Sequence, residues 1–148
     1  MVNVLQSVIL TRDDEMVLTP TYHLFKMYIP HQGAEYLPLH YESKQLRDKN
    51  NRVVNTLSAT ASRSEDGTVT ITLANVDLVS DCRITISLDD DKKYDVSGSI
   101  LTSKNISDHN TFEDSECIKT VKYDNFKSQK GSIEVVLPTK SIVSLTLK

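Results

Sequence analysis

The chain has 148 residues, of which 39% are hydrophobic and 25% are charged, and its formal net charge is −3. This length is enough for one domain with a substantial hydrophobic core. The slight negative charge argues against the basic surface typical of nucleic-acid-binding proteins, and no apolar run approaches the roughly 18 residues of a membrane-spanning helix. We therefore expect neither a nucleic acid nor a membrane as a partner.

The first segment is predicted to be a strand that is buried on both faces. Residues 2–10 read VNVLQSVIL, a nearly continuous apolar run of the kind found in parallel sheets covered on both sides. The polar stretch TRDDE follows. In it, Thr11 is a helix cap candidate and Asp14 comes three residues later, which allows a short turn of helix.

A helix is predicted over Pro20–Tyr28. Thr19 suits the N-cap, and Pro20 suits the first helical position because its missing N–H has no partner there in any case. Pro30 restricts the residue before it and ends the helix. The residues at helical spacing that would bury one stripe are Leu24, Phe25 and Tyr28.

After this helix the apolar period changes to two, which predicts strands. Residues 36–42 are typical of an edge strand, because Pro38 cannot donate to a ladder. Residues 53–63 and 68–76 flank the turn sequence SEDG and predict a hairpin, with Gly67 supplying a positive φ.

The C-terminal half continues as short strands. Residues 82–88 alternate between apolar and polar side chains, and residues 92–103 are predicted to form a strand pair or one bent strand with a bulge at Gly98. Residues 104–116 form a polar loop and residues 117–128 are extended. The last segment, residues 132–148, forms two strands joined by a turn. The residues predicted to point inward from the last two strands are Ile133, Val135, Leu137, Val143, Leu145 and Leu147. Short strands at this spacing predict an antiparallel β-sandwich or jelly roll.

Two cysteines, Cys82 and Cys117, allow at most one disulfide, and we favour two buried free thiols in a reducing compartment. The first ten residues lack the basic region and cleavage site of a signal peptide, so a cytoplasmic location is favoured.

Residues that carry chemistry are scattered. The histidines match no zinc spacing, the acidic runs lack the glycine and closing glutamate of a calcium loop, and no glycine-rich phosphate loop is present, so we expect no metal and no cofactor. The chain has no Trp, and its six Tyr residues are spread along it. Core filling therefore explains these rings better than an aromatic platform for sugar binding. The four histidines are His23, His31, His40 and His109.

Five segments together resemble one family. In chain order they read VNVLQSVILT, MVLTPTYHLFKMYIPHQ, LSATASR, GSILTS followed by HNTFED, and LPTKSIVSLTL. These segments resemble the C-terminal portion of glycoside hydrolase family 51, the α-L-arabinofuranosidases, in family order and over nearly the whole chain. In that family a (β/α)8 barrel carries the active site, and a jelly-roll-like sandwich follows it.

The resemblance implies an all-β fold, an antiparallel jelly-roll-like β-sandwich preceded by a short strand and helix left over from a barrel. Residues 1–30 would be the remnant of the last β/α unit of a missing barrel, and residues 31–148 would be the C-terminal sandwich. The partner would then be the catalytic barrel of the same parent protein. The family also implies that the segment before the barrel contributes to the sandwich, so an edge strand is expected to be uncovered here.

Enzymes of that family hydrolyse terminal non-reducing α-L-arabinofuranosyl residues with retention of the anomeric configuration. They use two catalytic glutamates, one in an Asn-Glu-Pro and the other in an Asp-Glu-Trp sequence context. Neither context occurs in this sequence, so no catalytic residue carries over and the chain resembles a non-catalytic accessory domain. Gln6 resembles the glutamine at the end of the last barrel strand that faces arabinose. Its amide could bond sugar hydroxyls only in the context of a complete barrel.

Two alternatives remain open from the residues. One is a free-standing carbohydrate-binding β-sandwich, and the other is a structural or self-associating sandwich without a sugar partner. The apolar side chains of Val4, Val8, Leu24 and Phe25 would lack barrel partners in this chain, and exposed patches of that kind predict a homo-oligomer.

Overall fold

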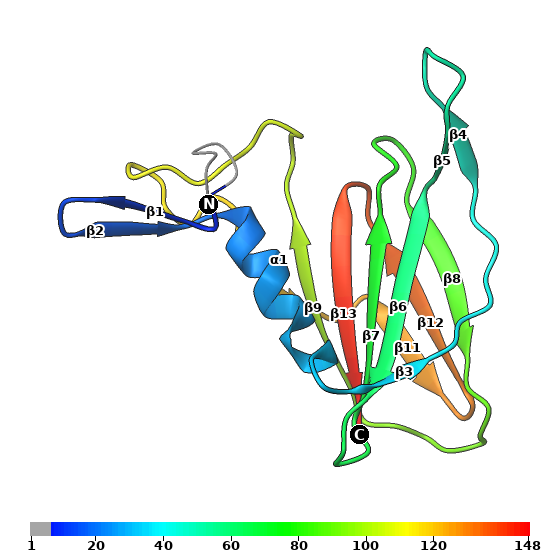
Figure 1. The fold of residues 1–148 in the computed structure, drawn as a ribbon. Helices are drawn as coiled ribbons and strands as arrows, with labels where there is room; N and C mark the ends of the chain where they lie inside the picture. The colour runs from blue at the N-terminus through cyan, green and yellow to red at the C-terminus, as the bar shows by residue number, and fades with distance from the viewer. Residues whose placement is uncertain (1–6) are drawn as a thin grey trace.

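The computed structural model describes residues 7–148, which form a β-sandwich with one helix on its outer side (Figure 1). The larger layer is an antiparallel six-stranded sheet with the spatial order β10 (Val121–Tyr123), β9 (Val96–Thr102), β13 (Ser141–Leu147), β7 (Val69–Asn75), β6 (Leu57–Arg63) and β3 (Glu35–Leu37). The smaller layer is an antiparallel three-stranded sheet with the order β11 (Phe126–Gln129), β12 (Ser132–Leu137) and β8 (Cys82–Ser87). The antiparallel sandwich predicted from the sequence is confirmed.

Two hairpins and two helical segments lie outside these sheets. The hairpins are β1 (Ile9–Arg12) with β2 (Glu15–Leu18), and β4 (Gln45–Arg47) with β5 (Val53–Asn55). The helical segments are α1 (Pro20–Tyr28) and the 3-10 turn η2 (Ile29–His31). None of the helices among residues 7–148 is long and apolar enough to cross a membrane.

The core lies between the two sheets and follows the period of two. The six side chains predicted to point inward from β12 and β13 are each at most 1% exposed, which confirms the prediction. Each such burial removes a whole aliphatic side chain from water and is worth about 1.5–3 kcal/mol. The turn between these strands crosses from one sheet to the other, and Lys140 takes a positive φ of 52° there.

The predicted hairpin around Gly67 is confirmed, since β6 pairs with β7 and Gly67 has a φ of +83°. Its first strand is shorter than predicted. Val53–Asn55 leaves the sheet and pairs with β4 instead. The change occurs at Thr56, whose N–H and hydroxyl both donate to the carbonyl of Lys44, at 2.9 and 3.1 Å.

An edge strand is present as predicted, because β3 lies at the edge of the larger sheet, but it is shorter than the predicted 36–42 and ends at Leu37, directly before Pro38. Within the predicted segment 92–103, only Val96–Thr102 form a strand, β9, and Gly98 is not a bulge. Its pairing with Leu145 and Tyr123 runs through without an inserted residue.

The N-terminal segment differs from the predicted doubly buried strand. Residues 2–6 lie outside the described part, and the following residues form a hairpin in which Ile9 pairs with Leu18 and Arg12 with Glu15. The stretch TRDDE contains its turn and no turn of helix, because Asp13 takes a φ of 52° and reverses the chain between β1 and β2. Most of β1 is exposed.

Helix α1 has the predicted bounds, but two details differ. The predicted buried stripe is rotated, since Met27 is buried whereas Phe25 is 62% exposed. The winding also continues past Tyr28, because Pro30 is accommodated inside η2. A proline early in a helical turn loses no hydrogen bond, which is why Pro30 does not end the segment where predicted.

Both cysteines are free, but the prediction that both are buried is wrong. Cys82 is only partly buried in β8, and Cys117 is exposed in the loop before β10. The loop turns outward between Asn110 and Ile118, both of which are buried.

Gly98 supplies a first testable prediction. A Cβ at this position would lie 2.6 Å from the carbonyl oxygen of Tyr123, an atom of the paired strand's main chain that cannot rotate away. We expect Gly98→Ala to lower the free energy of unfolding by about 1–3 kcal/mol, the usual cost of overpacking. Chemical denaturation of both proteins measures it. Ser97→Ala, at the exposed neighbouring position, should unfold like the parent, and an equally stable Gly98→Ala would contradict the close packing.

Candidate functional site

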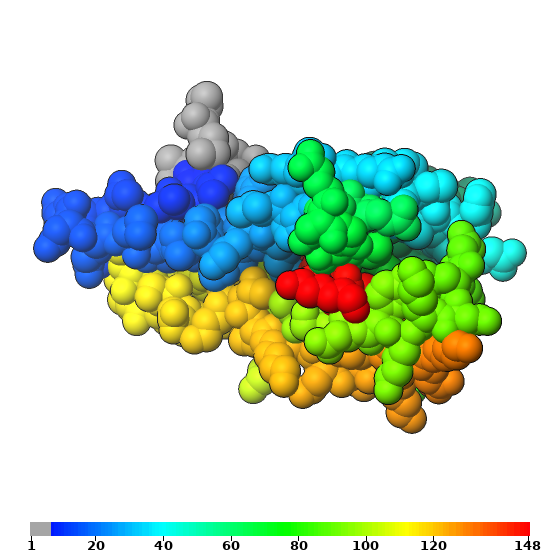
Figure 2. Space-filling model, turned by 90° about the horizontal axis from the view of Figure 1, so that it is seen from below, coloured from blue at the N-terminus to red at the C-terminus, as the bar shows by residue number. Residues whose placement is uncertain are grey.

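The candidate site is the N-terminal unit, defined as residues 7–31 with hairpin β1–β2, helix α1 and turn η2. It lies beside the sandwich and against the loop at residues 103–120 (Figure 2). Gln6, the predicted sugar-binding residue, directly precedes this unit in sequence and lies outside the described residues. The geometry of the unit therefore bears on how the chain next to Gln6 is held.

Thr19 closes the base of the hairpin. Its backbone is extended at the N-cap position of α1, as predicted, but its hydroxyl makes no capping bond to the helix. The hydroxyl reaches backwards instead and lies 2.8 Å from the carbonyl oxygen of Ser7 and 2.9 Å from that of Val8. The N–H of Thr19 also donates to the carbonyl of Val8, at 3.2 Å. Thr19, which follows β2, thus holds the residues that directly precede β1.

Asn110 ties this base to the sandwich loop. Its side-chain amide donates to the carbonyl of Leu18 at 2.7 Å and to that of Ile118 at 2.8 Å. Its amide oxygen accepts from the N–H of Ile118 at 2.7 Å. Every polar atom of this side chain, which is 3% exposed, is therefore paired.

Arg12 makes a second contact between hairpin and loop. Its guanidinium lies 4.2 Å from the ring centroid of Phe112 and 3.6 Å from the carboxylate of Glu113. It also pairs with Glu15 across the hairpin, at 2.8 Å. These groups are well exposed, so water screens the contacts, which act chiefly on orientation.

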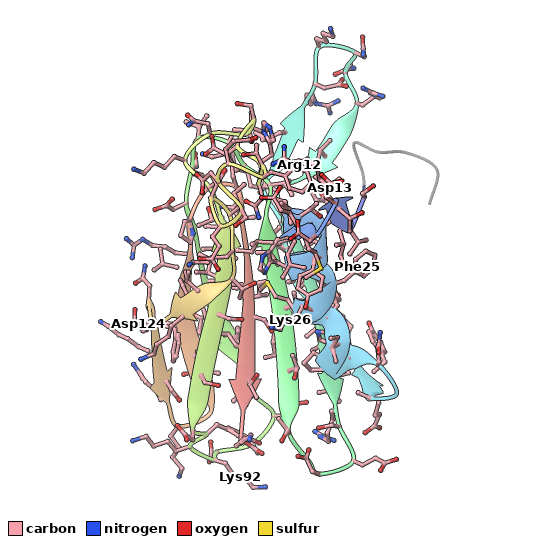
Figure 3. The ribbon with its side chains drawn as sticks, turned by 90° about the vertical axis from the view of Figure 1, so that its left-hand side faces the viewer. Arg12, Asp13, Phe25, Lys26, Lys92 and Asp124 are labelled. Carbon is pink, nitrogen blue, oxygen red and sulfur yellow. The ribbon has the colours of Figure 1, made fainter. Side chains whose placement is uncertain are left out.

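Helix α1 packs on the outer face of the larger sheet. Met27 forms a small apolar cluster with Leu101 of β9 and Ile118 of the loop, and Leu24 and Ile142 lie around it. The helix, the larger sheet and the smaller sheet are seen as successive layers in Figure 3, where Phe25 projects away from the strands.

His31 fastens the end of the unit to the same sheet face. Its Nδ1 lies 2.7 Å from the hydroxyl of Ser62, and its Nε2 lies 2.8 Å from that of Thr72. Burial lowers the pKa of His31 below its usual value of 6.5. The neutral ring can donate to one hydroxyl and accept from the other, so the folded state favours it.

The outward side of the unit is apolar and uncovered. Its exposed large hydrophobic residues are Ile9, Met16, Phe25 and Ile29. Apart from this surface, a groove of about 510 Å³ lies between β6 and β8, where the two sheets are not bridged by a strand. The inner surface of this groove includes Leu57, Leu73, Ile84 and Ile86.

The other residues weighed in the sequence form no centre of chemistry. Within residues 7–148, no group of three or more His, Cys, Asp or Glu is placed to hold a metal ion. Tyr123 is buried in the core, whereas Tyr36 and Tyr41 are exposed.

Sequence reasoning missed the roles of Thr19 and Asn110. Thr19 was recognised only as a helix cap, and Asn110 was part of a polar loop. The one sequence signal for Asn110 is its place in the segment HNTFED, which carries part of the family resemblance.

Comparisons with known proteins agree with this geometry. Residues 1–141 match the family model of the alpha-L-arabinofuranosidase C-terminal domain. The chain is 48% identical to an intracellular exo-alpha-L-arabinofuranosidase of Bacteroides ovatus over 147 residues, which are 99% of this chain and 29% of that protein.

Solved structures give the same result. The fold matches the GH51 arabinofuranosidase of Xanthomonas axonopodis pv. citri with a TM-score of 0.91 and 37% identity, over 100% of this chain and 30% of that one. AbfB of Bifidobacterium longum, a family 51 alpha-L-arabinofuranosidase, matches with a TM-score of 0.84 over 96% of this chain and 28% of that one. At 16% identity, this second match shows the fold alone. The chain spans less than a third of the length of these relatives.

The His31 contacts predict a pH dependence. Because the folded-state pKa lies below 6.5, the unfolded chain binds more protons just below that pH. Stability should therefore be full above pH 6.5 and fall as the pH drops from there toward the folded-state pKa. His31→Gln should flatten this decline, as measured by thermal unfolding across about pH 4.5–7.5, a range that spans both protonation states of histidine.

His23, whose pKa burial also lowers, should contribute to the slope that remains in the His31→Gln protein. His40→Gln, at an exposed position, is the matched control and should keep the parent's decline. An unchanged decline in His31→Gln would show that the two hydroxyl contacts do not select the neutral ring.

Proposed function

We propose a function from the premise that this chain belongs to the α-L-arabinofuranosidase C-terminal domain family. The sandwich, residues 31–148, is the accessory domain of a longer arabinofuranosidase and supplies no catalytic residue. Residues 1–30 complete the last β/α unit of its catalytic barrel. The length of the relatives, of which this chain covers 29–30%, leaves room for such a barrel in the same polypeptide.

The observation that carries this proposal is the two-sided character of the N-terminal unit. On its inner side the unit is held by the sandwich through Asn110 and Met27. On its outer side it presents exposed Phe25 and Ile29. A helix with one packed side and one uncovered apolar side is typical of an element between two packed layers. The barrel supplies the missing layer.

The reaction follows from the relatives and not from this chain. We propose that the parent enzyme removes terminal non-reducing α-L-arabinofuranosyl residues from arabinose-containing glycans inside the cell. The Bacteroides ovatus relative is named an intracellular exo-alpha-L-arabinofuranosidase, which supports the proposal. Gln6 then lies at the end of the last barrel strand, where its amide bonds hydroxyls of the arabinose.

Self-association is a second proposed property, because a specific surface favours it. Without a barrel, the exposed side chains of α1 lie near the apolar side of hairpin β1–β2, and the groove between β6 and β8 is open. The free edge of β8 also has unpaired main-chain groups that a second strand could bond.

The proposal that the parent protein is an arabinofuranosidase makes a direct prediction. The native protein that contains this chain should be several-fold heavier than 16.7 kDa in a mass measurement after antibody capture, and it should hydrolyse 4-nitrophenyl α-L-arabinofuranoside. Gln6→Ala in that protein should lower kcat/KM by about tenfold or more, because each lost hydrogen bond to substrate costs about 1.5 kcal/mol. A native species at 16.7 kDa would overturn the enzyme reading.

The surface of α1 makes a separate prediction for the isolated chain. It should form dimers or larger species at micromolar concentration in light scattering. The double variant Phe25→Ser, Ile29→Ser should shift it toward the monomer, because the change removes apolar area from the contact. Val79→Ser, which alters an 86% exposed side chain in the β7–β8 loop, is the matched control. A monomeric parent chain would count against this surface.

A further inference from the structure

The outer face of the smaller sheet carries a polar groove of about 520 Å³. We propose that this groove is a non-catalytic site that binds a neutral arabinose-containing oligosaccharide. The inference goes beyond the proposed function and rests on it only for the kind of sugar. It gives the sandwich a glycan contact of its own, separate from that of the catalytic barrel.

The alternation of the three strands places the side chains of the groove. In β12, Ile133 and Val135 are at most 1% exposed and point into the core, so their neighbours Glu134 and Val136 face outward. Strands β8 and β11 alternate in the same way. The outward residues that line the groove are Arg83, Thr85, Lys127, Glu134 and Val136. The groove therefore crosses all three strands of the sheet.

The charges in the groove are held apart. Glu134 lies directly opposite Lys127 on one side and Thr85 on the other, with Arg83 on the diagonal. Opposite charges at such positions are close enough to interact across a sheet. Within residues 7–148, however, Glu134, Lys127 and Arg83 take part in no ion pair and no side-chain hydrogen bond. Their polar atoms are therefore free for a ligand.

A buried tyrosine fixes one end of the groove. The hydroxyl of Tyr123, which is 5% exposed, donates to the carbonyl of Asn125 at 2.9 Å and also to that of Val136. The N–H of Val136 donates to the carbonyl of Asn125 at 3.3 Å. These bonds hold the link between β10 and β11 against β12, so Asp124 and Asn125 line the groove without a loop that must be ordered on binding.

The balance of charge indicates the class of ligand. An anion in the groove would meet the carboxylates of Asp124 and Glu134. A cation would meet Arg83 and Lys127. A hydroxyl both donates and accepts, so it can bridge a carboxylate and a cation that do not touch each other. Sugars carry hydroxyls on adjacent carbons, and Val136 offers an apolar contact for their C–H groups. A neutral sugar therefore satisfies both signs of charge in this groove.

The position of the groove keeps it accessible in the proposed parent enzyme. Helix α1 packs on the outer face of the larger sheet, so a barrel next to it lies on the other side of the sandwich from the groove. Figure 3 shows this separation, with Asp124 and Phe25 on opposite sides of the molecule. The volume lies within the range of about 300–1,000 Å³ that is typical of small-molecule sites. A short segment of a glycan could be held here, away from the active site.

Titration of the 148-residue chain with the linear trisaccharide arabinotriose, followed by heteronuclear NMR, tests the groove. We expect saturable shifts of the main-chain amides of Thr85, Glu134 and Val136. The dissociation constant should be about 1 mM, the level of a few net hydrogen bonds without aromatic stacking. Glu134→Ala and Arg83→Ala should each raise it about tenfold, because each removes hydrogen bonds to a charged group. Both side chains are exposed, so the folded spectrum should be retained.

Gln129→Ala is the matched control, because Gln129 faces outward from β11 on the same side as Lys127 but does not line the groove. It should bind arabinotriose like the parent chain. Absence of saturable shifts, or Glu134→Ala and Arg83→Ala proteins that bind like the parent, would overturn the site. Tighter binding of trigalacturonate, which carries three carboxylates, would show that the groove selects anions and would overturn the neutral class.

The proposed enzyme and the groove fail separately. Activity of the parent protein on 4-nitrophenyl α-L-arabinofuranoside tests the proposed function alone. An inactive parent whose sandwich binds arabinotriose would overturn that function and leave the groove in place. An active parent whose sandwich does not bind would overturn only the groove.

Discussion

The buried amide of Asn110 joins two parts of the chain that the sandwich core does not reach. It bonds Leu18 across 92 residues of sequence and closes its own loop on Ile118. This bond is partly buried, and a buried main-chain carbonyl left without a partner costs about 1–3 kcal/mol, so this side chain contributes strongly to the position of the hairpin. The Thr19 contacts and the Met27 cluster are consistent with that position, and the outward display of Phe25 follows from it.

The larger sheet is used on both of its faces. Strand β7 turns Ile71 and Leu73 into the sandwich core, while Thr70 and Thr72 are also buried, on the opposite face. That second face is partly polar and receives η2 through the bonds of His31 to Ser62 and Thr72. Apolar packing thus holds the two sheets together, whereas a mixture of apolar contacts and hydrogen bonds fixes the N-terminal unit. The difference gives the unit a specific orientation, because hydrogen bonds constrain direction as well as distance.

Local patterns in the sequence were sufficient for most of the sandwich. The period of two placed Ile133 and Val143 inward, and Pro20 marked the start of a helix with the observed bounds. Features that depend on distant partners were not predictable in this way. The apolar run before Arg12 is equally compatible with a buried strand and with half of a hairpin, because periodicity does not reveal which strand pairs with it.

The same reason explains the errors on the helix and at the site. The rotation that buries Met27 rather than Phe25 is set by Leu101 and Ile118, which lie more than 70 residues away along the chain. The backward bonds of Thr19 depend on where Ser7 and Val8 stand. Gln6 could be singled out only through the family resemblance, and it lies outside the described residues.

The 92-residue separation between Leu18 and Asn110 also sets an order of events during synthesis. At about 5–20 residues per second, the ribosome makes Asn110 roughly 5–20 s after Leu18. For most of that interval the hairpin and helix α1 have been made but lack the loop that fixes them. The N-terminal unit is therefore completed long after its own synthesis, and its apolar side chains are open to chaperones in the meantime.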